Sequence, residues 1–371
     1  MTSILFVNRT GRVSGAEAVL LRLIEAAVQR GDRVRLVSPP GRLVERLPDG
    51  VDHTEIDEFD LGGNRGVRRV VALGELGRRW WRAGRIIRRV RRADDVVVIN
   101  SLAALPAARL ARIPGGVSWL VHDTLSDSEQ RALVWMSRHA VTRAVAVSPP
   151  TAAALRPLGV SAGVAPLGVN IPPARDAEPM GTPVIGIMGV LTDWKGHRVL
   201  LQALATLPDV RCEIAGSAFH ADADYEMELR QMAEAPELAG RVTFLGHVDP
   251  LPTMRRWNVL VSASTSPEAS PVVVLEAMSL GVPVIATDHG GTPWLLRDGA
   301  GVLVPPGDPA ALAAAIHTLL HSADRGAAMA RLARQRVVAE HSAESAYPAM
   351  LDTLLGLTKG SVGYVVIPQN H

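Results

Sequence analysis

The chain has 371 residues, of which 47% are hydrophobic and 20% charged, and its formal net charge is +2 at pH 7. This length is typical of two domains, each large enough for its own core. No apolar run reaches the roughly 18 residues that a membrane-spanning helix needs, and a single cysteine, Cys212, excludes an intrachain disulfide. We therefore expect a cytoplasmic protein, with membrane association as an alternative.

The charge is divided unevenly along the chain. Residues 1–183 contain 26 Arg against 18 Asp and Glu, whereas residues 184–371 contain 13 Lys and Arg against 19 Asp and Glu. The basic half is therefore the one expected to meet an anionic ligand or surface.

Strand-like runs and helical patterns alternate along the chain. Apolar and β-branched runs predict strands, in chain order, at 3–8, 32–39, 95–101, 117–123, 184–189, 212–217, 242–247, 259–264 and 283–287. The first run lacks the basic region and cleavage site of a signal peptide. A helical pattern at 16–31, after a Ser-Gly pair, is typical of the segments between strands. This alternation predicts parallel sheets with helices on both faces and ligands at the carboxyl ends of the strands.

Residues 65–92 form the most basic segment, with eleven arginines, one acid, and Trp80 and Trp81 beside apolar residues. As a helix, this segment is suited to peripheral contact with an anionic membrane, with its tryptophans in the interface. The alternative is an ordinary arginine-rich surface helix. Nucleic-acid binding is not expected, because no recognised module is present and the other half of the chain is acidic.

His122 lies at the carboxyl end of the strand-like run 117–123, where a side chain is placed to contact a ligand. A capping or surface role is the alternative. Four prolines in residues 171–183 interrupt any periodicity and predict a domain boundary. The tail beyond Lys359 has no assignment.

Lys195 stands out because the chain uses Arg 37 times and Lys twice. In a strand-end loop, a lysine suggests that a compact point charge is needed. Such a charge is suited to a phosphate group, and a solvated surface lysine is the alternative.

Residues 266–291 carry the most informative pattern. Ser270 is a good N-cap, Pro271 fits the first helical turn, and an apolar helix then runs to Gly281. The acids Glu268 and Glu276 therefore flank a helix N-terminus, whose N–H groups are able to bind a phosphate. Two carboxylates around an anion site suit a phosphate flanked by hydroxyl-rich groups, such as a nucleotide sugar. The alternative is an ordinary βα unit with two solvated glutamates.

These segments resemble the retaining glycosyltransferases of the GT-B fold, and in particular family 4. Glu268 and Glu276 match its pair of glutamates with seven residues between them, and the run from Ala277 to Thr287 with Gly290 and Gly291 matches the next part of the same signature. Weaker matches lie at 14–17, 166–170, 188–196 and 301–316, so that the resemblance covers roughly residues 1–345.

The resemblance implies an α/β protein of the GT-B fold, with two Rossmann-like domains facing across a cleft. An N-terminal acceptor-binding domain is expected at 1–172, a C-terminal nucleotide-sugar-binding domain at 184–345, and a crossover helix and tail at 346–371. It implies transfer of a hexose, with retention, from a nucleotide diphosphate sugar to a hydroxyl acceptor such as a small molecule or natural product. A UDP-linked donor is favoured and no cofactor is expected.

The resemblance also assigns roles to particular residues. Glu276 matches the residue that binds the ribose hydroxyls, and Glu268 the one that contacts the transferred sugar. A front-face reaction is the expected mechanism, and a covalent role for Glu268 is the minority alternative. The catalytic residues implied are Glu268, His122 and Lys195. The donor-binding residues implied are Glu276, Lys195, Glu268, Ser270, Pro271, Gly189, Gly216, His247 and Val272. The acceptor-binding residues implied are Gly15, Asn100, His122 and Asn170.

Two positions depart from the family pattern. Val190 follows the glycine of the phosphate loop where an arginine is usual, and Trp294 stands where a glutamate is expected after the Gly-Gly turn. The first departure leaves open a non-catalytic nucleotide-sugar-binding protein of the same fold. The basic segment 65–92 leaves open a peripheral-membrane enzyme with a lipid-linked acceptor.

No metal site is expected. Asp222 and Asp224 have the spacing of the acids in metal-dependent transferases, but they lie in a polar stretch with no histidine at ligand spacing. Phosphate-loop and dinucleotide-binding glycine motifs are also absent, which disfavours ATP hydrolysis and nicotinamide chemistry. The sequence does not determine the base, the sugar, the acceptor or the oligomeric state.

Overall fold

The computed structural model describes residues 1–59, 67–175 and 179–357, and the chain folds into two compact units. The first unit contains Met1–Leu167 and the chain from Glu344 onward, and the second contains Gly168–Ala343. The expected domain limits of 172 and 346 lie within a few residues of these divisions. The tail assigned to residues 358–371 lies outside the described residues.

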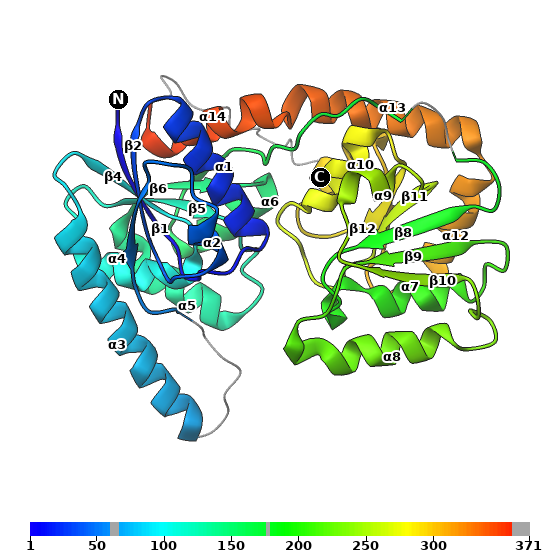
Figure 1. Ribbon diagram of the computed structural model, residues 1–371, viewed down its shortest axis with the longest axis horizontal. Coiled ribbons are helices and arrows are strands. Elements are labelled where there is room, and N and C mark those ends of the chain that lie inside the picture. Colours follow the sequence, from blue (N-terminus) through cyan, green and yellow to red (C-terminus); the bar gives the residue numbers. More distant parts are fainter. Residues whose placement is uncertain (60–66, 176–178, 358–371) are drawn as a thin grey trace. The chain divides into compact units, whose positions relative to one another are not determined.

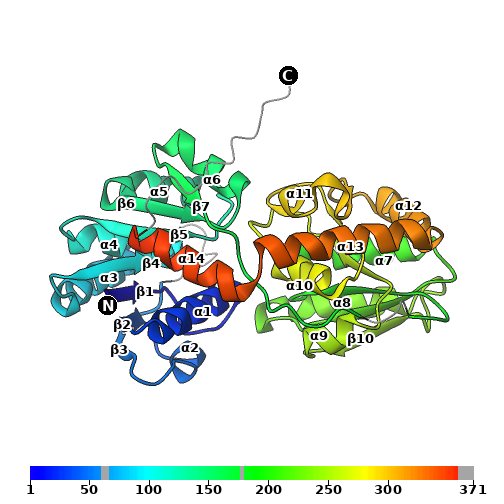
Figure 2. The same ribbon diagram turned by 90° about the horizontal axis from the view of Figure 1, so that it is seen from above.

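The first unit (Figure 1) is built on a parallel sheet of seven strands in the order β3-β2-β1-β4-β5-β6-β7, whose strands are labelled in Figure 2. Its strands are β1 (Ser3–Val7), β2 (Arg33–Ser38), β3 (Asp52–Glu55), β4 (Asp95–Ile99), β5 (Val117–Val121), β6 (Val141–Ala146) and β7 (Ala162–Val164). Its helices are α1 (Gly15–Gln29), α2 (Arg42–Glu45), α3 (Val67–Val90), α4 (Leu105–Ala111), α5 (Ser128–Ser137), α6 (Pro149–Leu155) and α14 (Ala343–Leu355). Short 3-10 turns are η1 (Leu102–Ala104), η2 (Arg138–Ala140) and η3 (Arg156–Leu158).

Both faces of this sheet are covered by helices. Alternate strand residues such as Val117 and Trp119 pack into one apolar core with α3, α4 and α5. Ser118 points to the opposite face, where its hydroxyl donates to the Leu354 carbonyl of α14 at 2.6 Å. The C-terminal helix is therefore part of the first unit.

The second unit has a parallel sheet of six strands in the order β10-β9-β8-β11-β12-β13, and Figure 1 shows β10, β9 and β8 side by side. Its strands are β8 (Val184–Met188), β9 (Arg211–Ala215), β10 (Val242–Gly246), β11 (Val259–Ser262), β12 (Val284–Thr287) and β13 (Val302–Val304). Its helices are α7 (His197–Leu204), α8 (Ala223–Ala233), α9 (Pro250–Met254), α10 (Val272–Leu280), α11 (Thr292–Leu295), α12 (Pro309–Leu320) and α13 (Ala323–Glu340). Its 3-10 turns are η4 (Asp193–Lys195), η5 (His220–Asp222) and η6 (Arg297–Gly299).

One face of the second sheet buries Ile185, Ile214 and Val261 against α7 and α12. The other face requires a glycine, because a Cβ at Gly186 would lie 2.0 Å from the buried ring of Trp257. Cys212 is buried in β9, and burial raises the pKa of its thiol to about 12, so that it is not a nucleophile at neutral pH.

Helix α3 contains most of the basic segment, although residues 65–66 and the side chains of 67–70 lie outside the described residues. The structure separates its two tryptophans. The Trp80 indole donates to the Ala103 carbonyl at 2.8 Å and packs on the core, whereas Trp81 is 52% exposed beneath the Arg85 guanidinium. One tryptophan, not two, is therefore available to an interface. Among the described residues, no helix is long and apolar enough to cross a membrane.

Candidate functional site

The strand order of the second sheet reverses between β8 and β11. In open parallel sheets, ligands bind beside the carboxyl ends of the strands at such a point. The loop after β8 carries Gly189 and Lys195, and the loop after β11 carries Ser264 and Glu268. The candidate site of the second unit is therefore built from these two loops and from α10, which follows the second of them.

Lys195 and Glu268 form an ion pair at this edge. The Lys195 Nζ atom lies 2.6 Å from Glu268 Oε2, and the two side chains are only 18% and 14% exposed. The Ser264 hydroxyl donates to the other Glu268 oxygen. Burial and the nearby Lys195 charge lower the pKa of His197 to about 4. This neighbour is therefore neutral, and Lys195 supplies the positive charge beside Glu268.

Glycine geometry fixes both loops. Gly196 has φ 75°, and a Cβ there would lie 1.8 Å from the Ala263 carbonyl oxygen, which locks the lysine loop against the end of β11. Gly290 has φ 62°, and its Cβ would lie 2.4 Å from the Glu268 carbonyl oxygen. The Gly291 amide donates to that same oxygen at 2.7 Å. The Gly-Gly turn therefore holds the backbone of Glu268.

The expected cap of α10 was wrong by one residue. Pro271, not Ser270, occupies the N-cap position, because φ −69° and ψ 111° leave it extended just before the helix. The Ser270 hydroxyl is buried and has no partner among the described residues. Val272 begins the helix, and the N–H groups of its first turn point out of the helix end.

Glu276 lies on α10, one turn beyond its start, and is half-buried. Burial, with a contribution from the Asp249 charge, raises the pKa of its carboxyl to about 7. Its carboxylate has no hydrogen-bond or ion-pair partner within the described chain. A half-buried acid left without a partner is suited to accept hydrogen bonds from a bound ligand.

Three more expected donor-binding residues lie just after neighbouring strands. Gly189 follows β8, and a Cβ at Gly216, after β9, would lie 1.8 Å from the Gly189 carbonyl oxygen. The Gly216 amide donates to Gly246 at 2.7 Å, and exposed His247 follows at the end of β10. Tight packing thus explains both glycines, whereas His247 is free to meet a ligand.

Trp294 has a packing explanation. Its ring meets the His341 ring edge-on at 5.4 Å, and the Arg297 guanidinium lies 5.0 Å from its centroid. It therefore joins α11 to the end of α13. Nothing in the structure explains why Val190 replaces the usual arginine.

The first unit has its own reversal point, between β1 and β4. Asn8 follows β1, Asn100 follows β4 and His122 follows β5, so that three strand ends bring polar side chains together. His122 Nε2 lies 3.1 Å from Asn100 Oδ1, and Asn100 Nδ2 donates to Asn8 Oδ1 at 3.0 Å. Burial lowers the pKa of His122 to about 4, so that its imidazole is neutral near pH 7.

The remaining acceptor-binding candidates lie differently from expectation. Gly15 is the first residue of α1 and not a turn residue, with Ser14 as N-cap, and a Cβ there would meet nothing within 4 Å. Asn170 is exposed and belongs to the second unit, beside Val169, which bridges to Ser342. The structure therefore joins Asn100 and His122, but not Asn170.

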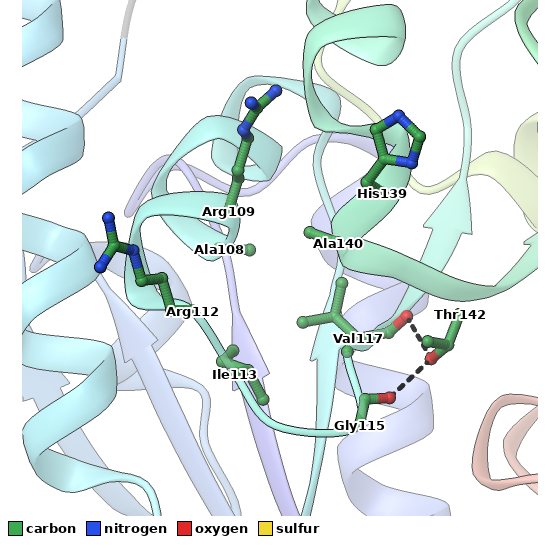
Figure 3. Close-up of a pocket in the computed structure, with 10 residues that line it drawn as sticks. Ala108, Arg109, Arg112, Ile113, Gly115, Val117, His139, Ala140 and Thr142 are labelled. Atoms are coloured by element: carbon green, nitrogen blue, oxygen red, sulfur yellow. Dashed lines mark hydrogen bonds between the residues drawn. The ribbon is translucent and has the colours of Figure 1, made fainter.

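A separate hollow of about 430 Å³ lies at the amino ends of β5 and β6 (Figure 3). Arg109 and His139 line it, and Thr142 donates to the Gly115 carbonyl at its base. It opens at the sheet edge opposite to that of Asn100 and His122, and is no part of the candidate site. Within the described ranges, no cluster of three or more His, Cys, Asp or Glu side chains could hold a metal ion.

Sequence reasoning missed Asn8, Ser264 and Asp249, and also Glu17, whose Oε1 accepts from Asn8 Nδ2 at 3.2 Å. Asn8 directly follows a buried strand, and Glu17 lies three residues after Ser14, which is the spacing of a capping box. Both signals were legible.

Asp249 caps helix α9 directly before Pro250, which is a local signal too, but its influence on Glu276 depends on tertiary packing. Ser264 reaches Glu268 only through tertiary packing.

Two parallel sheets with helices on both faces, each with polar residues at its reversal point, define a two-unit Rossmann-like protein. The family model "Glycosyltransferase Family 4" matches residues 13–171, and "Glycosyl transferases group 1" matches residues 172–336. The chain therefore belongs to glycosyltransferase family 4, with the GT-B fold.

Relatives and solved structures agree with this assignment. D-inositol 3-phosphate glycosyltransferase of Mycobacterium marinum is 34% identical over 185 residues, which are 48% of this chain and 39% of that protein. The lipopolysaccharide core biosynthesis glycosyltransferase LpsE of Rhizobium meliloti is 30% identical over 188 residues, 50% of this chain and 54% of that protein. The match thus spans about half of the length of these relatives, or less.

Among solved structures, Alr3699/HepE of Anabaena in complex with UDP and glucose superimposes with a TM-score of 0.77 at 23% identity, covering 96% of this chain and 100% of that chain. Sucrose-phosphate synthase of Thermosynechococcus elongatus gives 0.76 at 20% identity, covering 96% and 99%. These likenesses show the fold.

Proposed function

We propose that the protein transfers a hexose from a nucleotide diphosphate sugar, with UDP as the favoured nucleotide, to a hydroxyl acceptor with retention of configuration. The observation that supports this most strongly is the pairing of an unpartnered Glu276 on α10 with the Lys195–Glu268 ion pair at the neighbouring strand ends. One acid would accept both ribose hydroxyls, and the other would contact the hexose. The structure of HepE with UDP and glucose supports the choice of nucleotide by analogy of fold.

Lys195 would bind the diphosphate. In the unliganded protein its charge is matched by Glu268 at 2.6 Å, and a phosphate oxygen would add a second anionic partner. As the glycosidic C–O bond breaks, the diphosphate takes the bonding electron pair, and Lys195 with the first N–H groups of α10 would stabilise the growing charge.

The acceptor would react from the same face. Its hydroxyl oxygen forms a bond to the anomeric carbon as the bond to the diphosphate breaks, and the hydroxyl proton passes to the departing phosphate oxygen. Such a step needs no protein nucleophile. The protein would contribute orientation and charge stabilisation, with Glu268 beside the sugar.

The acceptor is proposed to be a small polyol or natural product, in contact with Asn100 and His122 of the first unit. A neutral histidine and an amide suit uncharged hydroxyl groups. The relatives carry names that refer to a phosphorylated cyclitol and to the lipopolysaccharide core, and these are the first acceptor classes to test.

Nucleotide binding is expected to raise the thermal stability of the protein. UDP, GDP, dTDP and ADP are compared, and a ligand at 100 times its dissociation constant adds about 2.7 kcal/mol to the free energy of unfolding. We expect UDP to give the largest rise in melting temperature. Glu276→Ala should abolish the rise, whereas Glu234→Ala, which alters an exposed glutamate in the same unit, should keep it. No shift with any nucleotide would contradict the proposal.

A peripheral-membrane enzyme remains the second candidate, because α3 exposes Trp81 beside Arg85. In that case the protein should sediment with phosphatidylglycerol vesicles but not with phosphatidylcholine vesicles, and Trp81→Ala should weaken sedimentation. Full recovery of wild type in the supernatant with both vesicles would exclude it. A non-catalytic relative of the same fold would bind UDP but release no nucleotide from any UDP-sugar.

A further inference from the structure

A continuous chain of hydrogen bonds runs from the helix α1 cap to His122. Glu17 Oε2 accepts from the Ser14 amide at 3.2 Å and from the Ser14 hydroxyl, and its Oε1 accepts from Asn8 Nδ2 at 3.2 Å. Asn8 Oδ1 accepts from Asn100 Nδ2 at 3.0 Å, and Asn100 Oδ1 lies 3.1 Å from His122 Nε2. The chain links residues from three strand ends and one helix.

The orientation of the two side-chain amides in this series of hydrogen bonds is fixed by backbone carbonyl groups, which can only accept. Asn8 Nδ2 lies 2.9 Å from the Thr10 carbonyl oxygen, and Asn100 Nδ2 lies 3.3 Å from the Ala16 carbonyl oxygen. A backbone carbonyl cannot donate, so that neither amide can exchange its nitrogen and oxygen without losing this bond. Each amide therefore presents its oxygen toward the histidine.

His122 must then donate from Nε2, because Asn100 Oδ1 is an acceptor. Its other ring nitrogen, Nδ1, carries the lone pair. Within the described chain Nδ1 has no hydrogen-bond partner. It is also not buried, so that a ligand can reach it. A ligand group that meets this nitrogen must therefore be a hydrogen-bond donor.

Capping of α1 explains the hydrogen bonds of only one of the two Glu17 carboxylate oxygens. Its Oε2 serves the Ser14 cap, and a cap needs no more than that. Its Oε1 is directed to Asn8, and both residues are buried, at 3% and 0% exposure. Asn8 has no helix to cap. Capping of α1 therefore does not account for the links from Glu17 through Asn8 to Asn100.

We propose that Asn8 and Glu17 are positioning residues that hold His122 as the Nε2–H tautomer, with Nδ1 ready to accept a hydrogen bond from a substrate hydroxyl. The part that concerns substrate rests on the proposed glycosyl transfer. The tautomer itself does not, and it is measured without substrate.

The first test reads the tautomer by ¹⁵N NMR of protein labelled at histidine, with the His122 signals assigned by their loss in His122→Asn. In wild type we expect a single form protonated at Nε2 between pH 6 and pH 8. Glu17→Gln keeps the size of the side chain but adds a donor, and it should admit a fraction of the Nδ1–H form. A wild-type proton on Nδ1, or a spectrum unchanged in both Glu17→Gln and Asn8→Ala, would overturn the proposal.

The second test asks whether Asn8 acts through His122. In His122→Asn the amide oxygen can take the place of Nδ1, whereas Nε2 is lost. We expect Asn8→Ala to lower kcat/KM about tenfold in wild type, and to have no further effect in the His122→Asn background. An equal loss in both backgrounds would show a role in folding alone and would reject the proposal. If no donor supports transfer, the proposed function fails, and the NMR result still decides the tautomer.

Discussion

Replacement of Lys195 by alanine is expected to lower kcat by a factor of about 10²–10³, which is the usual cost of removing one group that stabilises transition-state charge. Lys195 is one of two lysines in the chain, and its Nζ lies 2.6 Å from Glu268. Without it, the leaving diphosphate loses a point charge, and Glu268 stays half-buried with the Ser264 hydroxyl still donating to it. Initial rates at saturating donor measure kcat separately from KM.

The matched control is Arg230→Ala, which removes an exposed cation of the same unit that pairs with Glu226. It should keep wild-type turnover. The double variant Lys195→Ala with Glu268→Gln tests the pairing. It should recover thermal stability lost in Lys195→Ala, because no unpaired charge remains, but it should not recover kcat. Full activity of Lys195→Ala would remove this residue from the site.

Glu276→Gln is expected to stabilise the protein while it abolishes nucleotide binding. Burial raises the pKa of Glu276 from 4.5 to about 7 in the folded protein. Between these two pH values the folded protein binds more protons at this group than the unfolded chain, so that stability falls as pH rises from about 4.5 to about 7. At pH 8 the cost of the buried charge is about 3 kcal/mol at most. A neutral glutamine avoids it.

Thermal unfolding at pH 5 and pH 8 measures this difference. We expect Glu276→Gln to raise the melting temperature by several degrees at pH 8 and to change it little at pH 5. Glu234→Gln, at an exposed position of the same unit, should show no such dependence. UDP should weaken in binding to wild type as pH falls below about 7, because protonation removes the carboxylate. If Glu276→Gln gains no stability over wild type on going from pH 5 to pH 8, then burial does not raise the pKa of Glu276.

The parallel sheets and the positions of most strands were predictable from the amino-acid sequence. Buried parallel strands such as β1 and β12 are continuous apolar runs, because helices cover both of their faces. Four strands were missed. The edge strand β3 (Asp52–Glu55) is polar, Arg143 interrupts the apolar pattern of β6, and β7 and β13 have only three residues each. The glutamate pair around α10 was also legible, since a helix start is a local signal.

The contacts between these residues depend on the fold and could not be predicted. Lys195 and Glu268 are 73 positions apart and pair only because β8 and β11 are neighbours. Asn8, Asn100 and His122 come together for the same reason at the ends of β1, β4 and β5. The local sequence pattern determines which face of a helix or strand a residue lies on and where that helix or strand ends. The choice of neighbouring strand, and the burial that raises the pKa of Glu276, depend on packing between distant segments.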